Sequence, residues 1–132
     1  MIHKQKEPKR FDVIFMADPQ VTSIEDVHYL AHDIVEELIG TNAAFGASLG
    51  DLVFNKTELF DDLNKATGRI GIPWYNIKGN HDVGETSFES IYGPSYYSFD
   101  YGTVHFIVAD NSDWGGNKEH RDHQIEFIKN DL

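Results

Sequence analysis

The sequence contains no cysteine and no long apolar segment. Without cysteine, the chain can form no disulfide, no thiolate metal site and no cysteine nucleophile. No segment approaches the roughly 18 consecutive apolar residues that a membrane-spanning helix requires. The basic residues near the start are not followed by an apolar segment of the signal-peptide type. We therefore predict neither a membrane span nor a secretory signal, and the compartment stays open.

Basic residues are also scarce. The chain has 11 Lys and Arg against 22 Asp and Glu, which gives a formal net charge of -11. Nucleic acids and anionic membranes are bound by clustered Lys and Arg, so neither is expected as the main partner. An acidic chain that acts on phosphate needs positive charge from elsewhere. Bound metal ions would supply that charge, and they would explain why carboxylates gather at one place.

The composition that remains is that of one soluble globular domain. The chain has 132 residues, of which 40% are hydrophobic and 13% aromatic, and it shows no evident repeat. This length is sufficient for a buried core. We expect residues 1–10 to be a flexible basic tail, because they carry several Lys and Arg residues and no apolar pattern. Residues 11–132 are expected to be folded.

The apolar pattern predicts three strands that alternate with two helices. The strands are expected at 11–17, 43–49 and 72–77. Ser23 can cap the first helix and Gly40 ends it. Its predicted buried stripe consists of Ile24, Val27, Leu30, Ile34 and Leu38. Alternation of strands and helices with short connections favours parallel strands joined by crossover helices, and hence the α/β class.

The second helix and the C-terminal part complete this outline. Asn55 and Glu58 have the spacing of a helix cap. The apolar stripe that follows is Leu59, Leu63 and Ala66, closed by Gly68. Residues 96–108 predict a β-hairpin, which we expect to extend the sheet in the antiparallel direction. Residues 118–132 predict an amphipathic helix with Ile125, Ile128 and Leu132 on one face. This helix has no stop signal, so we expect the chain to be a truncated part of a larger domain.

Polar clusters follow all three predicted parallel strands. They are Asp18-Pro19-Gln20, Gly50-Asp51 and Gly79-Asn80-His81-Asp82. The carboxyl ends of parallel strands are where ligands gather in open α/β sheets. We therefore expect the three clusters to form one shared site. Each of the first two clusters alone would read equally well as a turn.

The residue types in these clusters suit metal-dependent hydrolysis. Asp18, Asp51 and Asn80 offer hard oxygen ligands for Mg, Mn, Fe or Zn, and Asp51 could bridge two cations. Two such cations would polarise phosphoryl oxygens and generate a metal-bound hydroxide near neutral pH. His81 would then donate a proton to the departing oxygen, and Asp82 would fix the tautomer of its ring.

Together, these three clusters resemble the calcineurin-like metallophosphoesterase family, whose motifs run D-x-H, G-D and G-N-H-[DE]. The resemblance covers residues 11–132 and implies the N-terminal part of a two-sheet α/β/β/α sandwich with a dinuclear metal centre. It implies that Asp18 binds the first metal, Asp51 bridges both and Asn80 binds the second. It further implies that His81 is the proton donor, with a phosphate mono- or diester as the substrate.

The chain departs from the family pattern at two points. Gln20 stands where the commonest motif has His, although some members carry D-P-Q, so Gln20 is expected to be a tolerated ligand variant. A later His and a G-H-x-H motif complete both metal sites in the family, and neither pattern follows Asn80 here. We therefore expect this chain to carry about half of the dinuclear site.

Two further features admit more than one interpretation. Trp114 could contact a substrate or serve only in packing. His120 and His123 have metal-pair spacing, but the charged residues around them favour a solvated helix start. For the whole chain, the main hypothesis is a phosphohydrolase that uses two divalent ions. The alternative is a non-catalytic half-domain that serves as a binding or assembly module and is completed by another segment or a second copy.

Overall fold

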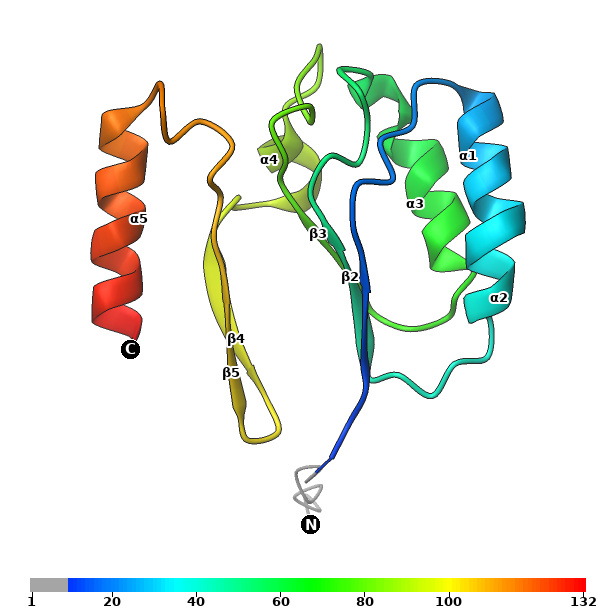
Figure 1. Ribbon diagram of the computed structural model, residues 1–132, viewed down its shortest axis with the longest axis horizontal. Helices are drawn as coiled ribbons and strands as arrows, with labels where there is room; N and C mark the ends of the chain where they lie inside the picture. Colours follow the sequence, from blue (N-terminus) through cyan, green and yellow to red (C-terminus); the bar gives the residue numbers. More distant parts are fainter. Residues whose placement is uncertain (1–9) are drawn as a thin grey trace.

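The computed structural model describes residues 10–132 and shows a mixed α/β fold (Figure 1). The predicted tail at residues 1–10 therefore lies outside the described residues, apart from the exposed Arg10. Three strands form a parallel sheet in the order β1-β2-β3, with bounds Val13–Met16, Phe45–Leu49 and Trp74–Ile77. This agrees with the predicted parallel arrangement. Each strand is shorter than its apolar segment, because the flanking residues belong to connecting loops.

The sheet is covered by helices on one face and by the hairpin on the other (Figure 1). The helical layer contains α1 (Ile24–Leu30), the π-helix η1 (Ala31–Val35), α2 (Glu36–Leu38), the 3-10 helix η2 (Thr57–Leu59) and α3 (Phe60–Gly68). The hydrophobic core lies mainly between this layer and the parallel sheet, and its most deeply buried members are Val21, Val27, Leu52, Val53, Phe60, Leu63 and Phe88. Core residues that follow β1 and β2, such as Val21 and Leu52, therefore hold the ends of these strands in place.

The first helix begins as predicted and then shifts its buried face. The Ser23 hydroxyl accepts a hydrogen bond from the Asp26 N–H at 3.2 Å, so Ser23 is the N-cap. At η1, the Glu36 N–H donates to the Ala31 carbonyl five residues back, which widens the turn. Because this turn contains one residue more than an α-helical turn, the side chain of Val35 faces the core and is 0% exposed, whereas that of Ile34 is 44% exposed. The predicted stripe is thus wrong at Ile34, because it assumed a uniform α-helical period, and it is also wrong at Ile24, which lies in the first turn and is 47% exposed.

The second helix begins later than its predicted cap. Thr57 starts η2, and Asn55 lies in the preceding loop without capping the helix. The predicted stripe residues Leu63 and Ala66 are buried, and Phe60 is buried with them. The helix N-terminus is displaced because Asn55 makes contacts with the loop after β3, described below.

The hairpin does not extend the parallel sheet. β4 (Tyr97–Tyr101) and β5 (Val104–Val108) pair with each other as a separate antiparallel sheet. The prediction that they would join the first sheet is therefore wrong. The hairpin instead packs on the sheet face through aromatic rings, with Phe45 at 5.6 Å from Phe99 and 5.3 Å from Phe106 between ring centroids. Burial of these rings favours stacking of the two sheets.

A last helix, α5 (Lys118–Asp131), lies beyond the hairpin, and the short α4 (Phe88–Tyr92) lies near the carboxyl end of β3 (Figure 1). On α5, Ile125 and Ile128 are partly buried and Leu132 is exposed. The fully buried residue is Gln124, whose amide bonds both backbone groups of Asp110. A polar side chain therefore attaches α5. Among residues 10–132, no helix is long and apolar enough to cross a membrane.

Candidate functional site

The loops that follow β1, β2 and β3 are joined by backbone hydrogen bonds. The Gln20 N–H donates to the Asp51 carbonyl at 2.8 Å, and Val21 and Val53 form a parallel bridge just beyond it. The Asn55 N–H donates to the His81 carbonyl at 2.9 Å. The loop after β2 therefore binds its neighbours on both sides. These bonds bring the three sequence clusters to one edge of the sheet, as the strand pattern predicts.

Glycine is required where the second and third loops meet. A Cβ on Gly79 would overlap the backbone nitrogen and the carboxylate of Asp51. Gly50, with a φ of +93°, packs against the backbone of Gly79 from the other side. Any larger residue at Gly79 would push the two loops apart. The glycine of the G-N-H-D cluster thus sets the distance between Asp51 and the loop after β3.

Backbone strain is concentrated in the same loops. Among residues 10–132, four residues other than glycine have a positive φ, namely Asp18 at 45°, Gln20 at 42°, Asp51 at 47° and Asn55 at 55°. Left-handed backbone costs about 1–3 kcal/mol for such residues and persists where the surroundings enforce it. Three of the four are predicted metal ligands. Strain of this kind is typical of sites whose side chains must point in fixed directions.

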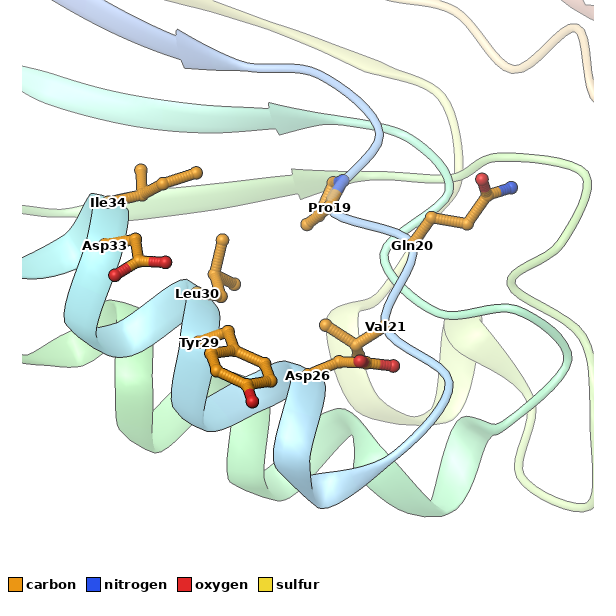
Figure 2. A pocket seen from close by; sticks show the side chains of 8 residues that line it. All are labelled: Pro19, Gln20, Val21, Asp26, Tyr29, Leu30, Asp33 and Ile34. Carbon is orange, nitrogen blue, oxygen red and sulfur yellow. The ribbon is translucent and has the colours of Figure 1, made fainter.

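Asp51 lies at the centre of the contacts between these side chains. Its Oδ1 accepts a hydrogen bond from the His81 N–H at 2.9 Å, and its Oδ2 accepts one from the Gln20 Nε2 at 3.4 Å. Figure 2 shows the Gln20 side chain extending away from Tyr29 and Asp33 of the first helix. The open depression of about 400 Å³ in that figure therefore lies beside the loop cluster rather than within it.

A second pocket, of about 180 Å³, lies directly at the strand ends. Its polar lining consists of Asp18, Asp51, Lys78, Asn80 and Asn111. Three of the four predicted metal ligands thus line one pocket, while Gln20 reaches it only through its bond to Asp51. Lys78 and Asn111 were not predicted. Asn111 follows β5, so the same strand-end rule would have identified it if the hairpin had been expected to face this edge.

The His81 ring is held by the loop after β2. It stacks on Phe54, with 4.3 Å between ring centroids and 28° between the planes. Its Nδ1 lies 3.4 Å from the Asn55 Oδ1. An amide oxygen can only accept, so Nδ1 is the ring nitrogen that would donate in this contact, and Nε2 is the ring nitrogen on the other side. Asn55 therefore occupies the orienting position that we expected for Asp82.

Asp82 is directed into the protein interior. It is 1% exposed, and its carboxylate accepts hydrogen bonds from the Gly79 N–H at 2.8 Å and the Val53 N–H at 3.1 Å. Burial raises the pKa of Asp82 above its ordinary value, although these N–H donors act to lower it. Asp82 thus fixes the geometry of the loops rather than touching the imidazole ring.

Lys78 lies between the pocket and α4. Its Nζ is 2.6 Å from the Glu89 Oε1, and its side chain is 19% exposed. Burial by itself would lower the pKa of Lys78. The hydrogen bond to Glu89 and the charges of Glu89, Asp110 and Asp113 outweigh burial and raise that pKa above its ordinary value. The ammonium group is therefore charged at the edge of an acidic pocket.

The donor atoms in the pocket are of the hard type. The carboxylates of Asp18 and Asp51 and the amide of Asn80 offer oxygen ligands, which suit Mg, Mn, Fe or Zn, while Gln20 lies beside the pocket. Within the described part of the chain, no three His, Cys, Asp or Glu residues come together as a metal-binding group. The pocket thus offers two carboxylates and amide oxygens, which are donors of the type that a divalent cation binds together with water or substrate oxygens.

Two other sequence candidates lie outside this pocket. Trp114 does not line it, and its indole nitrogen is buried without a hydrogen-bond partner among the described residues. His120 bonds Asp113 at 2.8 Å and lies beside Gln124, so it helps to attach the start of α5. His123, on the same helix, is exposed. The strand-end loops therefore remain the main candidate site.

In comparisons with known proteins, no family model matches the chain, and no match was found among curated proteins.

Proposed function

We propose that this chain is a metal-dependent phosphohydrolase that cleaves phosphate mono- or diesters, built on the N-terminal part of a calcineurin-like sandwich. The observation that carries the proposal is the pocket lined jointly by Asp18, Asp51 and Asn80. The motif resemblance and the strained backbone at Asp18 and Asp51 support it. The layer order of helices, parallel sheet, hairpin and α5 also supports it (Figure 1).

In this proposal, Asp18, Gln20, Asp51 and Asn80 would hold two divalent cations in the complete domain, with Asp51 as the central ligand. When bound, the cations would supply positive charge to the phosphoryl oxygens and lower the pKa of water. Asp51 is already fixed by the Gln20 amide and the His81 N–H, so its carboxylate needs little reorganisation on binding.

His81 acts as the proton donor to the leaving oxygen. Asn55 holds the ring at Nδ1 and Phe54 supports its face, so Nε2 is the atom that transfers the proton. Asp82 takes no direct part in proton transfer in this scheme. Its role is to hold Gly79 and Val53 at fixed positions, and thereby to keep His81 next to Asp51.

The test is hydrolysis of nitrophenyl phosphate with Mn²⁺ by the complete domain that includes this chain, together with elemental analysis of the metal bound by the complete domain and by the chain alone. We expect metal-dependent turnover that Asp51→Asn lowers by about 100-fold or more, because a central ligand is lost. Asp62→Asn is the matched control and should keep full activity, because Asp62 does not line the pocket and its one ion pair among residues 10–132 is with Lys65 on α3. Turnover that survives Asp51→Asn would disprove the assigned role.

A second candidate function, a binding or assembly module, rests on the apolar groove between the two sheets. This groove has a volume of about 200 Å³, and among its lining residues Phe15, Leu49 and Tyr75 are 57%, 44% and 37% exposed. Exposed apolar surface of this kind is typical of surfaces that are covered by another segment or chain. Sedimentation of the wild type and of Phe15→Asp would test it, since only a self-associating chain should change mass.

A further inference from the structure

Lys78 is the one basic side chain that lines the strand-end pocket within residues 10–132. The other ionisable groups in its lining, Asp18 and Asp51, are acidic. The chain as a whole carries a net charge of -11, so its field opposes the approach of a phosphate anion. A single cation inside the pocket therefore has a large influence on which anions can enter.

The position of the Lys78 ammonium group is fixed. Its contact with Glu89 joins the end of β3 to α4, and the Lys78 side chain is more buried than that of Glu89, at 19% against 43% exposure. Lys78 also directly precedes Gly79, whose backbone packs against Gly50 and Asp51, and Asn80 follows Gly79 in the same loop. The charge is thus attached to the same rigid loop as a predicted metal ligand, and little side-chain entropy remains to be lost on binding.

The Lys78 ammonium group has more hydrogen-bond donors than partners among the described residues. It carries three N–H donors, and Glu89 is its one hydrogen-bond partner among the described residues. Two donors remain for a ligand that enters the pocket. A phosphoryl group presents several acceptor oxygens, and charge-assisted hydrogen bonds to such oxygens are stronger than neutral ones.

We propose that Lys78 binds the phosphoryl oxygens of the substrate and gives the site a preference for phosphomonoester dianions over phosphodiester monoanions. The inference rests on the proposed function and deepens it. A dianion gains more from one fixed cation than a monoanion does, because the attraction scales with the product of the charges. A diester must also fit a second organic group into or beside a pocket of about 180 Å³.

A competing explanation is that Lys78 and Glu89 form only a structural ion pair between β3 and α4. The two explanations differ in the role of Glu89. If the pair is structural, removing either partner should have the same effect. If Lys78 binds phosphate, Glu89→Gln should leave phosphate binding within a few-fold of the wild type, since the ammonium group stays in the pocket.

The test compares nitrophenyl phosphate with bis(nitrophenyl) phosphate in the wild type, Lys78→Met, Lys78→Arg and Glu89→Gln. We expect Lys78→Met to lower kcat/KM by about 10- to 100-fold for the monoester, and by less than ~5-fold for the diester. Lys78→Arg keeps the charge and should keep the preference. Lys65→Met removes a charge from the exposed side of α3 and should change kcat/KM for neither ester. Equal losses for both esters, or a Glu89→Gln variant that behaves as Lys78→Met does, would overturn the proposal.

Binding of inorganic phosphate with Mg²⁺, followed by phosphorus NMR, gives a second readout that needs no turnover. We expect wild-type binding that Lys78→Met weakens by about 10-fold or more, with far-ultraviolet circular dichroism unchanged. If the wild type hydrolyses neither ester but shows this difference, the proposed reaction fails and the Lys78 site stands. If the wild type hydrolyses the monoester but Lys78→Met binds phosphate equally well, the Lys78 proposal fails alone.

Discussion

The two halves of this molecule are held together in different ways. In the half that contains β1, β2 and β3, backbone hydrogen bonds join the loops after the strands, and Gly79 allows two of those loops to touch. In the other half, the hairpin and α5 are attached by aromatic rings and by polar side chains such as Gln124. The loops of the first half are thus joined through the main chain, whereas the hairpin and α5 are joined to their neighbours through side chains.

The half that contains the parallel sheet also contains the strained backbone and most of the candidate site residues. The positive φ values at Asp18, Gln20 and Asp51 all lie in the first half. The exposed apolar groove lies between the halves. The candidate site at the strand ends thus lies mainly in the half whose loops are joined by backbone hydrogen bonds. The following variants weaken one half at a time.

The largest expected effect on stability comes from separating the halves at Phe45. This ring is 3% exposed and contacts the rings of Tyr75, Phe99 and Phe106. Phe45→Ala should lower the free energy of unfolding by about 3–5 kcal/mol, because it leaves a cavity between the sheets. Urea denaturation measures this change. Phe54→Ala, which removes a half-exposed ring from the loops, should cost less than about 1 kcal/mol, and an equal loss in both variants would contradict the account.

A smaller effect on stability is expected within the first half, at Gly79. Gly79→Ala should destabilise the fold by about 1–3 kcal/mol, because the added methyl group overlaps Asp51. It should also weaken cation binding, since Asp51 must move. Gly68→Ala is the matched control, because a Cβ at that helical position meets nothing within 4 Å. That variant should be neutral or more stable by up to about 1 kcal/mol.

The loop residue Asn55 offers a finer test, since its backbone and its side chain have separate roles. Asn55→Gly should keep the fold, because glycine accepts the φ of 55°, while removing the contact with the His81 ring. Asn55→Ala removes the same contact and should be less stable than Asn55→Gly by about 1–2 kcal/mol. Both variants should lower turnover by similar factors. Full activity in Asn55→Gly would show that His81 needs no such support.

The smallest expected effect concerns pH and the second half. His105 on β5 lies 2.7 Å from Asp100 and 2.7 Å from Asp131 at the end of α5. These hydrogen bonds, first that of Asp100 and then that of Asp131, raise the pKa of His105 above its ordinary value of 6.5. Protonated His105 therefore stabilises the fold fully below about pH 6.5, and this contribution is lost as the pH rises through the raised pKa.

Thermal unfolding between pH 5 and pH 9 would measure this linkage. His105→Gln should make the unfolding temperature less dependent on pH. His123→Gln, which changes an exposed residue of α5, should leave that pH dependence as it is in the wild type. A wild-type transition that is independent of pH across this interval would show that the contact between β5 and α5 contributes nothing to stability.

Features that depend on local sequence were predicted well. The Ser23 cap, the three strands and their parallel order follow from local pattern and short connections, and the structure agrees with all of them. The gathering of Asp18, Asp51 and Asn80 at one pocket follows from the same parallel order. These predictions succeeded because each needs only nearby residues or the direction of a strand.

Features that depend on tertiary contacts were predicted poorly. A π-helical turn buries Val35 instead of Ile34. A prediction that assumes 3.6 residues per turn cannot detect such a turn. The separate hairpin sheet depends on aromatic packing with Phe45, which strand patterns do not encode. The spacing of Asn55 and Glu58 predicted a helix cap. The actual partner of the Asn55 side chain is His81, which lies 26 residues away and cannot be identified from local spacing. Likewise, Asp82 was expected beside His81, whereas its oxygens satisfy buried backbone N–H groups.

The central claim is that the strand-end loops form a divalent-cation site around Asp51. Calorimetric titration of the chain with Mn²⁺, compared between the wild type and Asp51→Asn, tests it most directly. We expect saturable binding by the wild type that Asp51→Asn weakens by about 10-fold or more, with Asp62→Asn unchanged. Equal affinity in the wild type and Asp51→Asn, or no saturable binding by the wild type, would contradict it.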